Sequence, residues 1–112
     1  MPKQNQDIRL VQTELVKRLR QLQAALDETN DFDTAQAIVR EMQEVSHRIA
    51  IAGSLLFAAG AGQLAAKTDE VRKASTRAAQ AIRDFKEITD ITDAVTGFLG
   101  LVDEVLDLAK AL

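Results

Sequence analysis

The chain has 112 residues, of which 46% are hydrophobic and 28% are charged, a balance typical of one globular domain covering residues 1–112. Its formal net charge of −3 gives no general attraction to nucleic acid, and the lack of cysteine excludes disulfides and thiolate metal sites within it. The first dozen residues contain no apolar core of a secretory signal, so we expect a small acidic cytoplasmic protein.

The first predicted element is an amphipathic helix over residues 5–27. Apolar residues recur along it at intervals of three or four, at Ile8, Val11, Leu15, Leu19, Leu22 and Leu26. The stretch DETNDFD at 27–33 ends this helix, because Asn and Asp side chains bond their own backbone there and favour turns. Asp31 or Asp33 is the expected N-cap of the next helix.

The second predicted helix covers residues 33–59. Its apolar residues alternate at intervals of four and three, at Ile38, Met42, Val45, Ile49, Ala52, Leu56 and Ala59. Gly60 and Gly62 follow, and each lowers helix stability by about 1 kcal/mol relative to alanine. We therefore expect a turn at these glycines.

The third and fourth predicted helices cover residues 64–88 and 91–111. Thr68 is a candidate N-cap for the third helix, with Asp69 and Glu70 near the positive end of its dipole. The stretch TDITD at 89–93 predicts a break, and one continuous helix through it is the alternative. The fourth helix has a coiled-coil-like apolar repeat at Ile91, Val95, Phe98, Val102, Val105, Ala109 and Leu112.

Four helices of similar length joined by short turns predict an all-α fold, an antiparallel up-down-up-down four-helix bundle. Residues 1–26 carry five basic and two acidic side chains, whereas residues 89–112 carry one basic and five acidic ones. We expect the acidic fourth helix to lie beside helices one and three. A closed monomer and a dimer that exchanges helices three and four are both compatible with the pattern.

Residues 49–66 contain no charged side chain, which raises the question of membrane contact. Their length is at the lower limit for crossing a bilayer, but alanine, glycine, serine and glutamine bring the free energy of insertion close to zero. Small residues recur every four positions, at Ala50, Ser54, Ala58, Gly62 and Ala66. A second run follows at Ala74, Ser75, Ala78, Ala79 and Ala81. We therefore expect helices two and three to be the closest pair.

Helices two and four carry more apolar surface than a narrow core stripe needs. The surplus side chains are the predicted contact residues: Ile51, Leu55, Phe57, Leu99, Leu101, Leu106 and Leu108. Such a surplus is typical of an interface, with a homodimer as the first expectation. A deep bundle core that absorbs all of it is the alternative.

No residue pattern predicts a catalytic, cofactor or metal site. Glu44 and His47 have the spacing of di-iron helices, but the heptad places both on the outer face. Residues 27–33 resemble the start of a calcium loop, yet Phe32 stands where glycine is needed and Ile38 where glutamate is needed.

The sequence therefore predicts a non-enzymatic protein–protein interaction or assembly module. Its partner would be a second copy of itself or another protein, as a homo-oligomer, an adaptor or an inhibitor, with no nucleic acid involved. The alternative is a membrane-active helical protein that inserts residues 49–66 into lipid.

Overall fold

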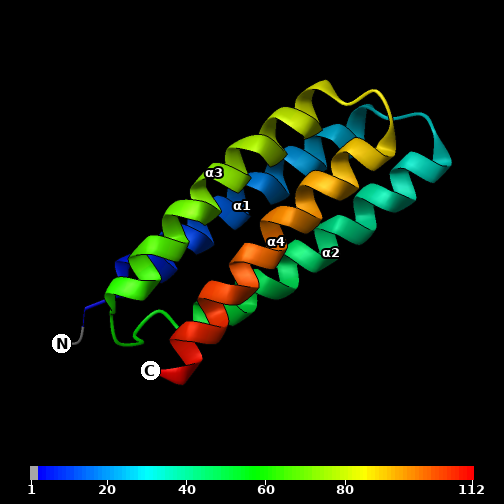
Figure 1. Cartoon of the computed structure of the whole chain (residues 1–112). Helices are drawn as coiled ribbons and strands as arrows, with labels where there is room; N and C mark the ends of the chain where they lie inside the picture. Colours follow the sequence, from blue (N-terminus) through cyan, green and yellow to red (C-terminus); the bar gives the residue numbers. More distant parts are fainter. Residues whose placement is uncertain (1–2) are drawn as a thin grey trace.

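The computed structural model describes residues 3–112, which form four α-helices and no strand in that range. The helices are α1 (Gln6–Glu28), α2 (Phe32–Ser54), α3 (Gly62–Asp84) and α4 (Ile88–Ala111). They form a bundle 48 Å long and 22 × 17 Å across (Figure 1). The predicted all-α four-helix bundle is confirmed. The second helix, however, ends at Ser54 and not near residue 59.

The order of the helices around the bundle differs from the prediction. Helix α1 packs against α2 and α3, and α4 packs against α3 and α2, while α2 and α3 lie diagonally opposite without contact. The expectation that helices two and three form the closest pair is therefore wrong, and Ala50 and Ser54 of the predicted ridge are exposed. The acidic fourth helix lies beside α3, as expected, but its second neighbour is α2, and it touches α1 only slightly. Its Asp103 pairs with Arg48 of α2 at 2.7 Å.

The bundle consists of two hairpins, α1–α2 and α3–α4. Consecutive helices run in opposite directions, and residues 55–61 cross the bundle from the end of α2 to the start of α3 (Figure 1). We call residues 55–61 the crossover. Because it joins diagonal helices, α1 lies parallel to α3, and α2 lies parallel to α4.

The small residues of α3 face α1. Arg18 donates a hydrogen bond to the carbonyl oxygen of Ser75 (3.1 Å), and Gln21 donates one to that of Ala79 (2.7 Å). The Ser75 hydroxyl donates to Glu14 (2.9 Å). Side chains of α1 reach these backbone oxygens because alanine and serine leave room beside them. Close packing by the small residues of helix three is thus real, but its partner is helix one.

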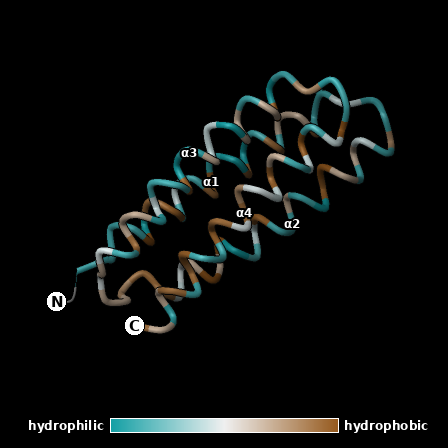
Figure 2. The backbone as a smooth tube through the Cα atoms, viewed as in Figure 1, coloured by the Kyte–Doolittle hydropathy of each residue, from teal (hydrophilic) through white to brown (hydrophobic). Residues whose placement is uncertain are grey.

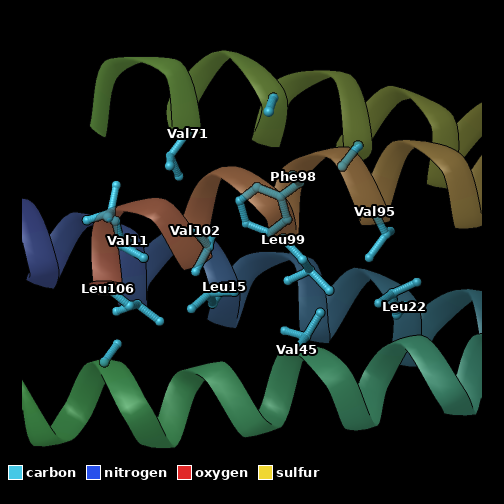
Figure 3. Close-up of a cluster of buried hydrophobic side chains, with 14 of the residues drawn as sticks. Val11, Leu15, Leu22, Val45, Val71, Val95, Phe98, Leu99, Val102 and Leu106 are labelled. Carbon is cyan, nitrogen blue, oxygen red and sulfur yellow. The ribbon is translucent and has the colours of Figure 1, made fainter. Parts of the chain in front are cut away.

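The core runs the whole length of the bundle and takes side chains from all four helices (Figure 3). Each large apolar side chain that is fully buried contributes about 1.5–3 kcal/mol relative to an exposed one. The largest of them include Ile8, Leu15, Leu22, Ile38, Leu64, Ile91, Phe98 and Leu106.

Two predicted helix starts require correction. Thr68 is not an N-cap: it lies within α3 and is 3% exposed, because α3 begins at Gly62 and so buries Leu64. The break before α4 lies at residues 85–87 and not at 89–93. Asp90 still caps the helix, since it accepts hydrogen bonds from the backbone N–H groups of the two residues that precede Ile88.

Asn5 ties the start of α1 to the crossover. Its side-chain oxygen accepts hydrogen bonds from two N–H groups in the first turn of α1 and so acts as N-cap. Its Nδ2 donates to the carbonyl oxygens of Ala58 and Ala59 (both 3.1 Å), and its backbone N–H donates to Leu56. Asn5 is 7% exposed, so these bonds form largely out of water.

We expect Asn5→Ala to lower the free energy of unfolding by about 1–3 kcal/mol, because the variant loses the N-cap and leaves crossover carbonyls unpaired. Chemical denaturation followed by circular dichroism measures this change. Asn30→Ala is the control, since Asn30 is exposed and its side chain makes no hydrogen bond within residues 3–112. Equal stability of both variants would contradict the role of Asn5.

We expect Asp31 and Asp90 to make stability depend on pH in the acid range. The pKa of Asp31 is lowered by hydrogen bonds from the Thr34 side chain and backbone, and that of Asp90 by backbone N–H donors. A carboxyl with a lowered folded-state pKa stabilises the fold above its ordinary value of 3.8, and this contribution is lost as pH falls through the folded value.

The measurement is the urea midpoint of the native protein and of Asp31→Asn/Asp90→Asn between about pH 5 and pH 2. The double variant should lose less stability over this range than the native protein does. Asp107→Asn, at an exposed position of α4 without a hydrogen bond in the described chain, should follow the native curve.

Candidate functional site

The segments that connect the helices at the two ends of the bundle differ in charge. The end with the α1–α2 and α3–α4 turns carries charged side chains at Asp27, Glu28, Asp31, Asp33, Arg83, Asp84, Lys86 and Glu87. The opposite end contains the last turn of α2, the crossover and the first turn of α3, which together are the charge-free residues 49–66. The start of α1 and the end of α4 lie at this end too (Figure 1), and they carry Asp7, Arg9, Asp107 and Lys110. We call residues 49–66 the uncharged tip. Figure 2 shows the crossover as apolar and the α1–α2 turn as hydrophilic.

The uncharged tip exposes one large aromatic side chain among small neighbours. Phe57 is 61% exposed, and Ile51 and Leu55 are half-buried beside the core. The other exposed residues of the tip are Ala50, Ser54, Ala59, Gly60, Gly62, Gln63, Ala65 and Ala66. An exposed aromatic side chain within an uncharged surface is the type of feature that anchors protein contacts.

The structure does not bring all predicted contact residues to one surface. Leu99 and Leu106 are 5% and 2% exposed, and Figure 3 shows them directed toward α2 inside the core. They are buried because α4 lies between α2 and α3, and these two helices cover both flanks of its apolar stripe. Leu101 and Leu108 are half-buried, and Leu108 lies next to Lys67 on the side of α4 that faces α3.

A second exposed apolar group lies at the other end of α2. Phe32 is 72% exposed and Val39 is 40% exposed, seven residues apart on one outer face. A shallow cavity of about 380 Å³ lies beside them, lined also by Ala35, Gln36, Arg40 and Gln43. This group was not predicted, although its seven-residue spacing outside the core stripe is a usable signal in the sequence.

A cavity of about 560 Å³ lies between the last turns of α1 and α3. Ala25, Ile82 and Phe85 supply apolar lining, and Arg83 supplies charge. The side-chain oxygen of Gln21, which also lines it, is buried and has no hydrogen-bond partner among the described residues. The cavity thus contains one free hydrogen-bond acceptor, the Gln21 oxygen. Its lining residues do not form an arrangement of acid, base and nucleophile.

The residues first tested for chemistry have structural partners or face outward. Glu44 pairs with Arg48 at 2.9 Å, and His47 is exposed. Asp31, from the calcium-like stretch, accepts hydrogen bonds from Thr34 as the N-cap of α2. Within residues 3–112, no group of three or more His, Cys, Asp or Glu side chains is placed to hold a metal ion.

Glu41 is the one carboxylate of the described chain that is buried, at 9% exposure. Burial raises its pKa, and the nearby Glu44 adds to the rise, while Arg40 and Arg48 oppose it. It lines a cavity of about 370 Å³ between α2 and α4. A single buried acid does not by itself make a catalytic centre.

Arg48 joins the two hairpins. Its guanidinium donates from Nε to Asp103 (2.7 Å) and from Nη2 to the other oxygen of the same carboxylate (2.9 Å). Hydrogen bonding to Asp103 is the main reason why the pKa of Arg48 is raised. Such a bidentate pair has a defined geometry, so it helps to set α2 against α4.

Sequence reasoning missed Asn5 as the residue that holds the tip in place. Its type and position were a usable signal, because asparagine three residues before the first buried residue of a helix is a typical N-cap. Its contact with the crossover lies 53 positions away in the sequence, and no local pattern indicates it.

No family description, no curated protein and no solved structure matches this chain. Among residues 3–112, no helix combines the length and the apolar character needed to cross a bilayer.

Proposed function

We propose that this protein is a non-enzymatic interaction or assembly module, that it acts in the cytoplasm, and that its contact surface is the uncharged tip. The observation that supports the proposal most strongly is Phe57, which is 61% exposed within residues 49–66, where no charge is present. Ile51 and Leu55 extend the apolar surface along the adjoining turn of α2. The first partner we propose is a second copy of the chain, and the second is another protein.

Desolvation favours Phe57 over Phe32 as the contact residue. Burying a phenylalanine side chain from water contributes about 1.5–3 kcal/mol, and small uncharged neighbours can be covered without the cost of removing water from charges. The other exposed phenylalanine, Phe32, lies next to Asp31 and Asp33. A partner that covered Phe32 would also have to cover or pair these carboxylates, which favours Phe57 as the anchor.

We expect Phe57→Asp to weaken self-association at least about 30-fold, because it places a charge at the centre of the contact. Light scattering on a sizing column, over a range of protein concentrations, measures this effect. Phe32→Asp is the matched control, since it makes the same change at the opposite end of α2 and should leave association unchanged. Circular dichroism should show that both variants remain helical.

Retention of the oligomer by Phe57→Asp would reject the tip as the contact surface. A native protein that is monomeric at every concentration would leave another protein as the partner. Immobilised native chain and its Phe57→Asp variant would then be compared for capture of cellular proteins, and equal capture by both would also reject the tip.

A lipid surface is the second candidate for the same tip, because residues 49–66 carry no charge and expose Phe57. Membrane activity would require the hairpins to part, so that the half-buried Leu56 leaves the bundle. We expect Leu56→Asp to stop leakage of a dye from vesicles if lipid is the target. Leakage that is unchanged in this variant, or absent for the native protein, would reject the lipid function.

A further inference from the structure

We propose that the partner of the uncharged tip is a second copy of this chain, and that the two copies exchange hairpins. In this dimer the α3–α4 hairpin of each copy packs on the α1–α2 hairpin of the other. The proposal rests on the proposed function only in requiring self-association through the tip. It adds how the two copies are joined.

The topology provides the interface for exchange. The crossover, residues 55–61, is the only segment of chain that links the two hairpins. All other attachments between them are non-covalent: α1 packs on α3, α2 packs on α4 through contacts that include the Arg48–Asp103 pair, and α1 touches α4 slightly. The α3–α4 hairpin of a second, identical chain fits the same surface of α1–α2 equally well. The dimer therefore uses the contacts between hairpins that the closed bundle already contains.

The geometry explains why the tip should lack charge. Helix α2 ends and α3 begins at the same end of the bundle (Figure 1), so straightening the crossover directs α3 away from α2 along the bundle axis. Two straightened chains form two bundles end to end, each made of the α1–α2 hairpin of one chain and the α3–α4 hairpin of the other. Residues 49–66 of both chains then meet at the two-fold axis, so the tip of one chain faces the tip of the other. Charged tips would repel, whereas the charge-free residues 49–66 with the exposed Phe57 do not.

The sequence of the crossover favours straightening. The heptad pattern of α2 continues through Leu56 and Ala59, although α2 ends at Ser54. Within the crossover, Gly60 is the residue with the lowest helix propensity, and Gly62 follows it as the first residue of α3. Neither has a positive φ, and a Cβ added to either would meet no atom within 4 Å. The closed bundle therefore does not need glycine at these positions for steric reasons.

Asn5 is the side chain that opposes opening. Its Nδ2 holds the carbonyl oxygens of Ala58 and Ala59, which in a continuous helix would instead accept hydrogen bonds from the backbone four residues on. Asn5→Asp keeps an oxygen for capping α1 but removes these two donors. This variant should therefore shift the protein toward the exchanged dimer without loss of the N-cap.

The deciding experiment uses charge reversal across the hairpin interface. Arg48→Asp and Asp103→Arg chains, one of them isotope-labelled, are unfolded together, refolded and examined by native mass spectrometry. If hairpins are exchanged, the mixed dimer contains one native and one reversed ion pair, whereas each pure dimer contains only like charges. The mixed dimer should exceed its statistical share at least about tenfold.

The matched control is the ion pair between Lys67 and Glu104 (3.3 Å), which lies within the α3–α4 hairpin. Exchange cannot repair this pair, so Lys67→Glu and Glu104→Lys chains should mix at the statistical ratio. The double variant Arg48→Asp/Asp103→Arg should fold and associate like the native protein. Statistical mixing of the Arg48→Asp and Asp103→Arg chains would overturn the exchange and leave contact between intact bundles.

A second test changes the crossover and the first residue of α3. Gly60→Ala/Gly62→Ala should raise the dimerisation constant at least tenfold, since Gly60→Ala favours the helical crossover by about fivefold in each of the two chains. Gly62 is already the first residue of α3 in the closed bundle, so its replacement contributes less. Gly97→Ala/Gly100→Ala is the control, because these exposed glycines of α4 also have open space around a new Cβ. The control should raise thermal stability and leave the dimerisation constant unchanged.

The outcomes separate the two proposals. Dimers that Phe57→Asp abolishes but that mix statistically would support contact through the tip and overturn the exchange. A chain that remains monomeric with Gly60→Ala/Gly62→Ala and with Asn5→Asp would also overturn the exchange. A mixed dimer enriched only for the Arg48–Asp103 variants establishes it.

Discussion

The diagonal crossover is the constraint on which the arrangement of this bundle depends, and Asn5 is the contact that holds it. Because residues 55–61 join opposite corners, α3 lies beside α1 and α4 lies beside α2. This order brings the small residues of α3 against the polar face of α1, and it brings Asp103 within reach of Arg48. The early end of α2 at Ser54 has the same origin, since the chain must leave the helix to cross the bundle.

Apolar periodicity was sufficient to predict the four helices and most of the core. Ile8, Val45 and Phe98, for example, follow from intervals of three and four residues and are fully buried. Periodicity gives the buried face of a helix but does not say which neighbour covers it. Two orders around the bundle, with adjacent or with diagonal hairpins, bury the same stripes. The choice depends on contacts such as Asn5 with Ala58, which join residues far apart in the sequence.

The candidate site was predicted only in part, for a related reason. Phe57 was identified because it lies outside the core stripe, and it is exposed. Leu99 and Leu106 were also assigned to the surface, on the assumption that a narrow stripe is buried, but α4 is covered on two flanks and both side chains lie in the core. How much of a helix is buried depends on how many neighbours it has, and the sequence of one helix does not contain this number.

The absence of charge from residues 49–66 is not required by the bundle. Of these 18 residues, only Ala52 and Leu64 are buried, while Ala50, Ala59, Gln63, Ala65 and Ala66 are exposed. Charged side chains at these positions would cost the folded monomer little, and comparable positions at the other end of the bundle carry them. An uncharged surface without a folding reason supports the proposed contact, because every charge placed there would have to be desolvated or paired when the surface is covered. The proposed exchange of hairpins would meet this requirement, since it would place the tip of one copy against the tip of the other.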